Sequence, residues 1–391
     1  MIHLLRKLKY QAHRRWDESL HWRAWLGSFG LPHHVHGIDP RPFSFARQPS
    51  RSSQWILDLS AGVALLEGPL APVRLVGYAY YKPQHGLASV EAWTLIGNRS
   101  LSQCPEFRMD QQWQLLRELR EAKPERLIDT PTLLLRHVNS HFGHFVVEML
   151  GQLLWGAELL SSTPSLAGVE LAVFAPSGSW QEFLRQLCPS APWRFYDPAC
   201  LLEGPLRFRQ PLVAPRLSPW QSLAIARNTI ASHLARPADA GSMAGPERLL
   251  LSSSPPLSRI ANFEPVCDAL QQRGFQLANP LQLPVGELFR QLAGAEQLVS
   301  EQGSVFLNAL LCRQAPTLVL SSRVPPGVDP VLFFCRGGIY NEVARGNHRE
   351  LICEPVNYDH YQHPYSQRIQ VDIQNMLLVL DRFYPASQLI G

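Results

Sequence analysis

The strongest constraint on the fold is a regular alternation of short apolar segments and amphipathic segments over residues 247–322. The apolar segments, such as RLLLSS, QLVS and TLVLSS, have the length of buried strands, and the segments between them carry apolar residues at helical spacing. Strands that alternate with helices are typical of a parallel sheet, because parallel strands need long crossover connections. We therefore predict a Rossmann-like unit in this half of the chain.

A similar but less regular alternation precedes this unit, with the strand-like segments TLLLRH, VELAVFAP and RQPLVAP. The segment RPADAGSMAGP between the two halves is rich in Ala, Gly and Pro, as linkers are. A chain of 391 residues is also too long for one hydrophobic core. We predict an α/β protein in which two Rossmann-like domains face a central cleft, a favoured place for a ligand. The predicted parts are an N-terminal extension with a β-rich segment (1–125), a first domain (126–236), a second domain (247–340) and a C-terminal tail and helix (341–391).

The two ends of the chain support further expectations. Three strands are expected between residues 52 and 100. After residue 322 we expect irregular chain up to a helix near VDIQNMLLVLDRFY, which we expect to pack back towards the first domain. The N-terminal segment MIHLLRKLKYQAHRRWDESLHWRAW is basic and aromatic, and it is a candidate for peripheral contact with an anionic membrane surface. The alternative is a solvated helix that covers the first domain.

Charge and cysteine usage narrow the classes of function. The net charge of +4 is mild, so it permits an anionic substrate but does not indicate nucleic-acid binding. Seven scattered cysteines without a CxxC pair favour reduced thiols over a disulfide framework or a zinc site. No apolar run of the length of a membrane span or a signal peptide core is present. We therefore expect a cytoplasmic protein, with the N-terminal segment as the candidate for contact with the inner face of the membrane.

The stretch HVNSHFGHFVVEMLGQLL (137–154) has apolar residues at the spacing of one helical face. On the opposite side, His141, His144, Glu148 and Gln152 fall within a narrow stripe. A histidine titrates near neutral pH and is suited to act as a general base, and a glutamate one turn later can orient its ring or share its proton. The alternative is that these side chains only form hydrogen bonds across the domain interface.

Two stretches of the second half are suited to bind an anion. In QLVSEQGSVFLNALLC (297–312), a turn with Gly303 separates a strand from a helix, so backbone N–H groups can approach a phosphate at the carboxyl end of a parallel sheet. In LSSSPPLSRIANFE (251–264), Arg259 follows another strand, and arginine is suited to forked contact with phosphate. The alternative is an ordinary capped loop with a solvated arginine.

Together these stretches resemble glycosyltransferase family 61 over about residues 130 to 325. NSHFGHFVVEMLGQL is similar to the first motif, N-x-G-H-[WF]-x-x-[ED]-x-L-P-x-L, with glycine at Gly151 in place of the usual proline. In the second motif, Ser253 stands in place of an arginine, and in the third, H-G-A-G-x-x-N, Gln302 stands in place of the histidine. The residues that match are Gly143, His144, Phe145, Glu148 and Leu150 in the first motif, Ser252, Arg259, Asn262 and Glu264 in the second, and Gly303 and Asn308 in the third.

The resemblance implies a two-domain GT-B fold. It also implies an inverting glycosyltransferase that moves a sugar from a nucleotide-sugar donor to a glycan acceptor, with no cofactor and no obligatory metal. The Glu-x-Gly-Ser form of the third motif resembles a bacterial branch of the family, of the capsular or exopolysaccharide type. The implied catalytic residues are His144 and Glu148. The implied donor-binding residues are Ser252, Arg259, Gln302, Gly303, Ser304 and Asn308, and additional cleft candidates are Asn139, His141 and Glu301.

Two alternatives remain at this point. The chain is a non-catalytic sugar- or nucleotide-binding relative if the substitutions at Ser253 and Gln302 ended turnover. It is a metal-dependent hydrolase if His141, His144 and Glu148 bind a metal, although H-x-x-H-x-x-x-E differs from the H-E-x-x-H spacing of zinc proteases.

Overall fold

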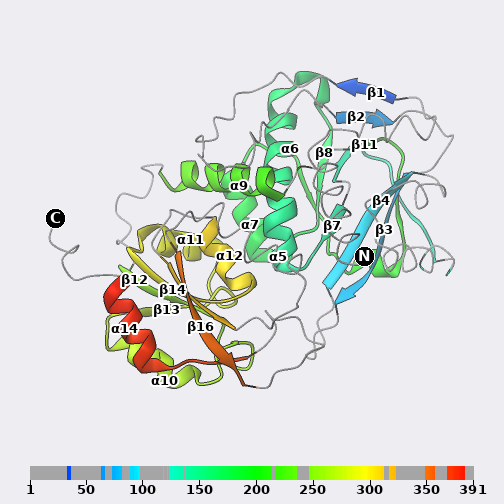
Figure 1. Cartoon of the computed structure of the whole chain (residues 1–391). Coiled ribbons are helices and arrows are strands. Elements are labelled where there is room, and N and C mark those ends of the chain that lie inside the picture. The colour runs from blue at the N-terminus through cyan, green and yellow to red at the C-terminus, as the bar shows by residue number, and fades with distance from the viewer. Residues whose placement is uncertain are drawn as a thin grey trace, which may run out of the picture. The chain divides into compact units, whose positions relative to one another are not determined.

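The computed structural model describes a mixed α/β protein with several sheets (Figure 1). The chain divides into two compact units, Met1–Ala226 and Arg227–Gly391, and the division falls within helix α9 (Pro219–Leu234). Three predicted segments lie outside the described residues: the N-terminal basic segment, the first predicted strand and the linker. Pro246, the last residue of the linker, is described. The described residues are 33–36, 63–66, 73–81, 89–96, 118, 121, 123–135, 137–213, 217, 219–235, 246–311, 317–322, 348–356 and 368–383.

One sheet of the first unit has four parallel strands in the order β11-β6-β8-β9, with β2 and β1 added antiparallel beside β11. Helix α6 (Leu150–Ser162) connects β6 to β8, and α7 (Gly178–Leu187) connects β8 to β9, as the alternation predicted. Gly156 of α6 lies against Leu133 and Leu171, so this helix packs on the sheet. The strands are β1 (His33–His36), β2 (Val63–Leu66), β6 (Thr132–Leu134), β8 (Glu170–Val173), β9 (Trp193–Phe195) and β11 (Pro211–Val213).

The second sheet of the first unit has the order β5-β10-β3-β4-β7. Its long antiparallel pair, β3 (Val73–Tyr81) and β4 (Ser89–Ile96), confirms two of the three strands expected between residues 52 and 100. The chain moves from the first sheet to the second between β6 and β7 (His137–Asn139), and β7 pairs with β4. The remaining elements of the unit are β5 (Arg126–Ile128), β10 (Leu206–Phe208), α8 (Cys200–Glu203) and the 3-10 turn η3 (Pro164–Leu166).

The helix expected over residues 137–154 begins only at Phe142, because residues 137–139 form strand β7. A short α5 (Phe142–His144) is followed by a π-helical turn, η2 (Phe145–Met149), and then by α6. A π turn inserts an extra residue and is frequent at functional sites. The extra residue shifts the faces of the helix, so a stripe drawn for an ideal α-helix does not continue to Gln152. Gln152 is buried; its Nε2 donates to the carbonyl of Glu148, and its Oε1 accepts from Leu217 N–H at 3.4 Å.

The second unit has one sheet in the order β13-β12-β14-β15-β16-β17, and all neighbours are parallel except β16 and β17. Numbered along the chain, the five parallel strands are arranged 2-1-3-4-5. This confirms the predicted Rossmann-like alternation. The elements are β12 (Arg248–Leu251), α10 (Phe263–Gln271), β13 (Gln276–Ala278), α11 (Val285–Gly294), β14 (Gln297–Glu301), η5 (Ser304–Phe306), α12 (Leu307–Leu310), β15 (Thr317–Ser322), β16 (His348–Pro355), β17 (Ile369–Gln370) and α14 (Ile373–Phe383).

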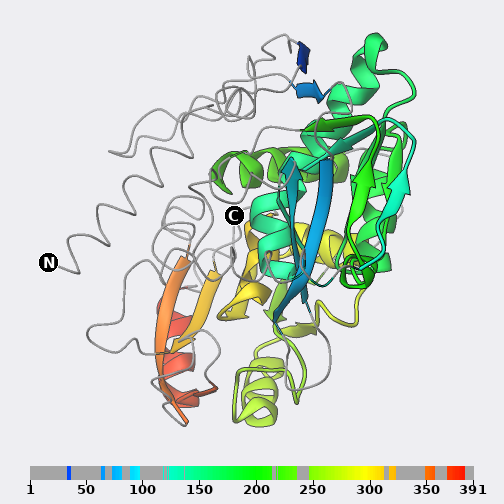
Figure 2. The same ribbon diagram turned by 90° about the vertical axis from the view of Figure 1, so that its right-hand side faces the viewer.

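Strand β16 corrects the expectation of irregular chain after residue 322. It pairs with β15 over six residues and is drawn in orange beside it (Figure 2). Its residues alternate between buried and exposed from Leu351 to Glu354, but charged residues occupy its first half, so the sequence carried only a weak strand signal.

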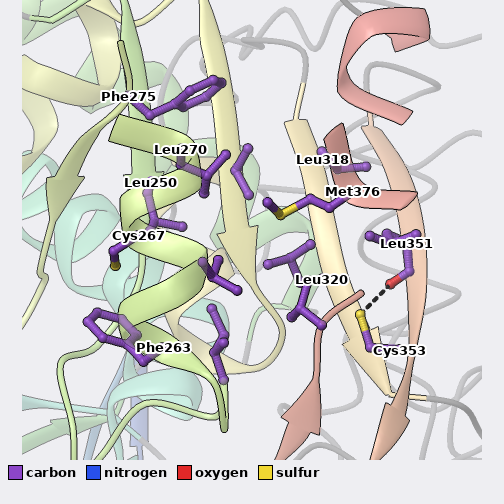
Figure 3. Packing of buried hydrophobic residues seen from close by; sticks show 14 of the residues in the cluster. Leu250, Phe263, Cys267, Leu270, Phe275, Leu318, Leu320, Leu351, Cys353 and Met376 are labelled. Atoms are coloured by element: carbon purple, nitrogen blue, oxygen red, sulfur yellow. Dashed lines mark hydrogen bonds between the residues drawn. The ribbon is translucent and has the colours of Figure 1, made fainter. Parts of the chain in front are cut away.

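The C-terminal helix packs within the second unit, so the expectation that it packs back towards the first domain was wrong. Met376 and Leu380 of α14 are buried in the same hydrophobic cluster as Phe263 and Leu270 of α10. Figure 3 shows Met376 directed towards Leu270. An ion pair of 2.5 Å between Arg273 and Asp381 adds a contact at the surface. In the part of the chain that the structure describes, no helix has the length and apolar composition to cross a membrane.

Candidate functional site

Ionisable side chains of the first unit form a continuous row, which we call the histidine–glutamate chain. It runs from the partly exposed His144 to the buried Glu91. His144 Nδ1 lies 2.9 Å from Glu148 Oε1, and Glu148 Oε2 lies 3.3 Å from His137 Nδ1. On its other side, His137 Nε2 lies 3.0 Å from Glu91 Oε1. The hydroxyl of Tyr78 donates to Glu91 Oε2 at 2.7 Å and ends the chain.

Solvent access falls steadily along the histidine–glutamate chain. The side chain of His144 is 37% exposed and that of Glu148 is 19% exposed, whereas His137 and Glu91 are 6% and 3% exposed. A substrate therefore has access to His144. The more buried side chains, His137 and Glu91, support the His144–Glu148 pair from the interior.

Strand register brings the buried members of the chain together. Tyr78 of β3 lies opposite Glu91 of β4, and Trp93 of β4 lies opposite His137 of β7. Directly opposed and diagonal residues on one face of an antiparallel pair are close enough to interact. Glu91 and His137 are such a diagonal pair, and the Trp93 ring lies tilted against that of His137 with centroids 4.3 Å apart.

Both carboxylates of the chain are held in the ionised form. Burial by itself raises the pKa of Glu148, but His144 and His137 outweigh it and hold that pKa well below its ordinary value. Burial also raises the pKa of Glu91, and here the hydrogen bonds from His137 and Tyr78 outweigh it, so that pKa is lowered too. Two negative charges therefore flank His137 at neutral pH.

The structure brings His144 and Glu148 together, four residues apart. His141 lies beside them, with its ring edge-on to His144 at 5.7 Å between centroids. Its backbone N–H donates to Asn139 Oδ1 at 2.9 Å, and Asn139 is buried at the end of β7. Asn139 and His141 thus shape the start of the helical segment that carries the pair.

Sequence reasoning missed His137, Glu91 and Tyr78. His137 belonged to the segment assigned to the helix, and Glu91 lies inside an otherwise apolar strand, VEAWTLI. A carboxylate in such a strand is rarely buried without a partner, and this was the available signal.

The donor-site candidates of the second unit gather at the carboxyl ends of β12 and β14. The buried carboxylate of Glu301 connects the two ends: its Oε1 accepts from Ser253 N–H at 2.9 Å, and its Oε2 accepts from Ser258 Oγ at 3.0 Å and from Arg259 N–H at 2.9 Å. Glu301 was predicted as a cleft residue, and its oxygens hold the loop after β12 against the end of β14.

Arg259 and Gly303 are in direct contact. A Cβ atom placed on Gly303 would lie 3.2 Å from Nε of Arg259 and 3.4 Å from its Cζ, so the guanidinium lies against this glycine. Gly303 also has a φ of 95°, in the left-handed region that favours glycine. The loop after β12 and the turn after β14 thus place a cation beside the half-buried backbone of a glycine.

Gln302 is buried beside this turn. Its Oε1 accepts hydrogen bonds from the backbone N–H of Ser322 at 2.8 Å and from the Ser322 hydroxyl at 3.2 Å. Among the described residues, its buried Nε2 has no hydrogen-bond partner. A buried donor of this kind is rare in folded proteins and calls for an explanation.

The other predicted donor residues have local roles. Asn308 Nδ2 donates to the carbonyl of Val305 at 2.9 Å, and Ser252 Oγ donates to the carbonyl of Ser253 at 3.1 Å. The helix expected after Ser304 consists only of the short η5 and α12. So short a helix contributes little dipole, because the macrodipole is summed over aligned peptide units. Anion binding here depends instead on Arg259 and the glycine turn. Within the described ranges, no group of three or more His, Cys, Asp or Glu side chains is arranged to hold a metal ion.

Comparison with known protein families gives a match over part of the chain. Residues 142–320 match the family model Glycosyltransferase 61. The matched segment contains His144 and Glu148 as well as Arg259 and the turn at Gly303. No curated protein matches the chain.

Proposed function

We propose that the chain is a glycosyltransferase, because residues 142–320 match the family model Glycosyltransferase 61, and that it moves a sugar from a nucleotide-sugar donor to a glycan hydroxyl with inversion. The bond between the anomeric carbon and the phosphate oxygen breaks as the bond to the acceptor oxygen forms. The nucleotide diphosphate leaves with the electron pair, and the proton of the acceptor hydroxyl passes to the protein.

The second unit is the proposed donor site, and its strand order is the observation that carries the proposal. In a 2-1-3-4-5 sheet, ligands bind at the carboxyl ends of the two strands where the order reverses. These strands are β12 and β14, and the contact between Arg259 and Gly303 lies at their ends. The guanidinium supplies the positive charge that a departing diphosphate needs, and the glycine lets its oxygens approach the backbone.

Gln302 is the proposed further contact with the donor. Its Oε1 is held by Ser322, which fixes the orientation of the amide and directs Nε2 elsewhere. A phosphate or sugar oxygen of the nucleotide sugar would accept a hydrogen bond from this buried N–H₂ group. Gln302 then takes the place of the histidine of the third motif and donates a hydrogen bond without carrying a charge.

His144 is the proposed general base. Glu148 accepts from Nδ1, so Nε2 is the nitrogen that takes the acceptor proton. The ionised Glu148 then stabilises the imidazolium that forms. Proton transfer of this kind contributes about 10²–10⁴ in rate.

The wider setting is proposed from the family resemblance and the sequence. We propose a GT-B arrangement of the two units and transfer of a hexosyl or pentosyl group without an obligatory metal. We also propose a role in polysaccharide or glycan synthesis, as in a bacterial capsular or exopolysaccharide branch. The proposed location is cytoplasmic, with peripheral membrane contact through the N-terminal basic segment.

A thermal-shift screen of the full chain against nucleoside diphosphates and nucleotide sugars tests the proposal. A ligand at 100 times its Kd stabilises the folded state by about 2.7 kcal/mol, and a shift confined to particular nucleotides is expected. Each stabilising nucleotide sugar is then incubated with glycan acceptors, and release of the nucleoside diphosphate with a new glycan product is measured. No stabilisation by any nucleotide would overturn the donor site, and binding without transfer would identify a non-catalytic relative.

A further inference from the structure

His137 lies between two carboxylates, and each of its ring nitrogens faces one of them. Nε2 is 3.0 Å from Glu91 Oε1, and Nδ1 is 3.3 Å from Glu148 Oε2. An ionised carboxylate can only accept hydrogen bonds. A neutral imidazole carries one N–H, so it would point a lone pair at one of these oxygens and repel it.

We infer that His137 is an imidazolium that bridges Glu91 and Glu148, and that it is a positioning residue for the His144–Glu148 pair. The role in positioning rests on the proposed function, but the protonation of His137 does not. The charges then alternate along the chain, with negative Glu91, positive His137 and negative Glu148.

The surroundings of His137 favour its charged form. A buried charge is tolerated when it is paired and hydrogen-bonded, and carboxylates lie on both sides of His137. The ring of Trp93 lies 4.3 Å away, within the range of a cation–π contact. Among the described residues, Glu91 from β4 and Glu148 from η2 face its ring, with Tyr78 and His144 behind these two.

The bridge has a consequence for the reacting histidine. One oxygen of Glu148 is held by His137, so the other stays directed at His144 Nδ1. Neutral His144 must then carry its hydrogen on Nδ1, the less common tautomer of a free imidazole. This leaves Nε2 as the proton acceptor. His137 and Glu91 thus select the tautomer of the base from the interior of the unit.

Nitrogen-15 NMR of the full chain with labelled histidine measures these protonation states directly. The ring signals are assigned by loss in the H137Q and H144Q variants. At neutral pH we expect both His137 nitrogens to be protonated. At a pH where His144 is neutral, we expect its hydrogen on Nδ1. A His137 ring with a single protonated nitrogen would overturn the bridge.

Two variants test the positioning role. In H137Q, Glu148 loses its cation, and we expect His144 to shift towards the Nε2–H tautomer. In E91Q, which keeps the shape of the site, we expect His137 to lose one proton at a pH where the wild type keeps both. T94V is the control, because Thr94 is buried on β4 with its side chain on the other face, where it donates to the carbonyl of Leu135 at 2.8 Å. An unchanged His144 tautomer in folded H137Q, or an unchanged His137 in E91Q, would overturn the inference.

Kinetics separate this inference from the proposed function. With any nucleotide sugar that supports transfer, H137Q should lower kcat by about 10–100-fold, part of the 10²–10⁴ contributed by a general base. The KM for the donor should stay unchanged, and T94V should retain the wild-type kcat. A wild-type kcat in H137Q would overturn the positioning role. If no nucleotide sugar is turned over by the wild type, the proposed function fails, whereas the NMR result still decides whether His137 is a bridge.

Discussion

Replacement of Gly151 by alanine should destabilise the first unit, although alanine is the better helix former. Gly151 lies at the start of α6, where it faces Ser222 of α9. A Cβ atom on Gly151 would lie 1.9 Å from the carbonyl oxygen of Ser222 and 2.4 Å from its carbonyl carbon. The backbone N–H of Gly151 also donates to Ser222 Oγ at 3.2 Å. The obstructing atoms are backbone, so the two helices must move apart.

The magnitude follows from three opposing terms. Alanine gains about 1 kcal/mol over glycine in a helix. Overpacking costs about 1–3 kcal/mol, and the strained hydrogen bond costs about 1 kcal/mol. The net loss for Gly151→Ala is therefore about 1–3 kcal/mol of unfolding free energy. At about 2–4 °C per kcal/mol for a unit of this size, Tm should fall by several degrees.

Urea and thermal unfolding followed by circular dichroism measure this loss, and the chain offers a matched control. Gly178, at the start of α7, has nothing within 4 Å of its Cβ position. Gly178→Ala should therefore leave stability unchanged or raise it slightly. Gly156→Ala should fall between the two, because its nearest neighbour, at 3.2 Å, is the end of the flexible Leu133 side chain. Equal stability of the Gly151→Ala and Gly178→Ala proteins would refute the close approach of α6 and α9.

Three further predictions concern the charged residues. Arg259→Ala should weaken binding of the best nucleoside diphosphate by about 1.5–3 kcal/mol in isothermal titration calorimetry, whereas Arg290→Ala on the exposed face of α11 should not. Glu301→Gln should lower the unfolding free energy by about 1.5–3 kcal/mol in urea, because an amide cannot accept from all three donors of the loop after β12, and equal loss in the exposed control Glu296→Gln would argue against this. The pKa of Glu148 is lowered on folding, so its contribution to stability is present above its ordinary value of 4.5 and is lost as the pH falls below that value. The urea midpoint should therefore fall more steeply on acidification for the wild type than for Glu148→Gln.

Local periodicity was sufficient to predict the alternation of strands and helices in the second unit. The strand–helix alternation between residues 247 and 322 is found with each element in its expected place. It also led to the correct position of the donor candidates, because the carboxyl ends of neighbouring parallel strands must share one edge of a sheet. Arg259 and Gly303 meet there although they are far apart in the sequence.

The parts that could not be predicted depend on pairing between distant segments. Whether residues 137–139 are helix or strand is decided by hydrogen bonds to β4, and their apolar spacing fits both. The same pairing places His137 beside Glu91, which no local pattern can indicate. The π turn is another such case, because the spacing of apolar residues does not distinguish it from an α-helix. The helical pair His144 and Glu148 was accessible to sequence reasoning because its spacing is local.

The central claim is that His144 is the base of a transfer reaction whose donor binds elsewhere. The most direct test compares His144→Ala with the wild type in two assays, transfer from the nucleotide sugar identified by the thermal-shift screen and calorimetric binding of the same nucleotide. His141→Ala serves as the control, because it removes the neighbouring ring and leaves both partners of the hydrogen bond between His144 and Glu148 in place. We predict that His144→Ala loses about 10²–10⁴ in kcat, with its nucleotide affinity and melting temperature close to those of the wild type. Near-normal transfer by a folded His144→Ala protein would contradict the account.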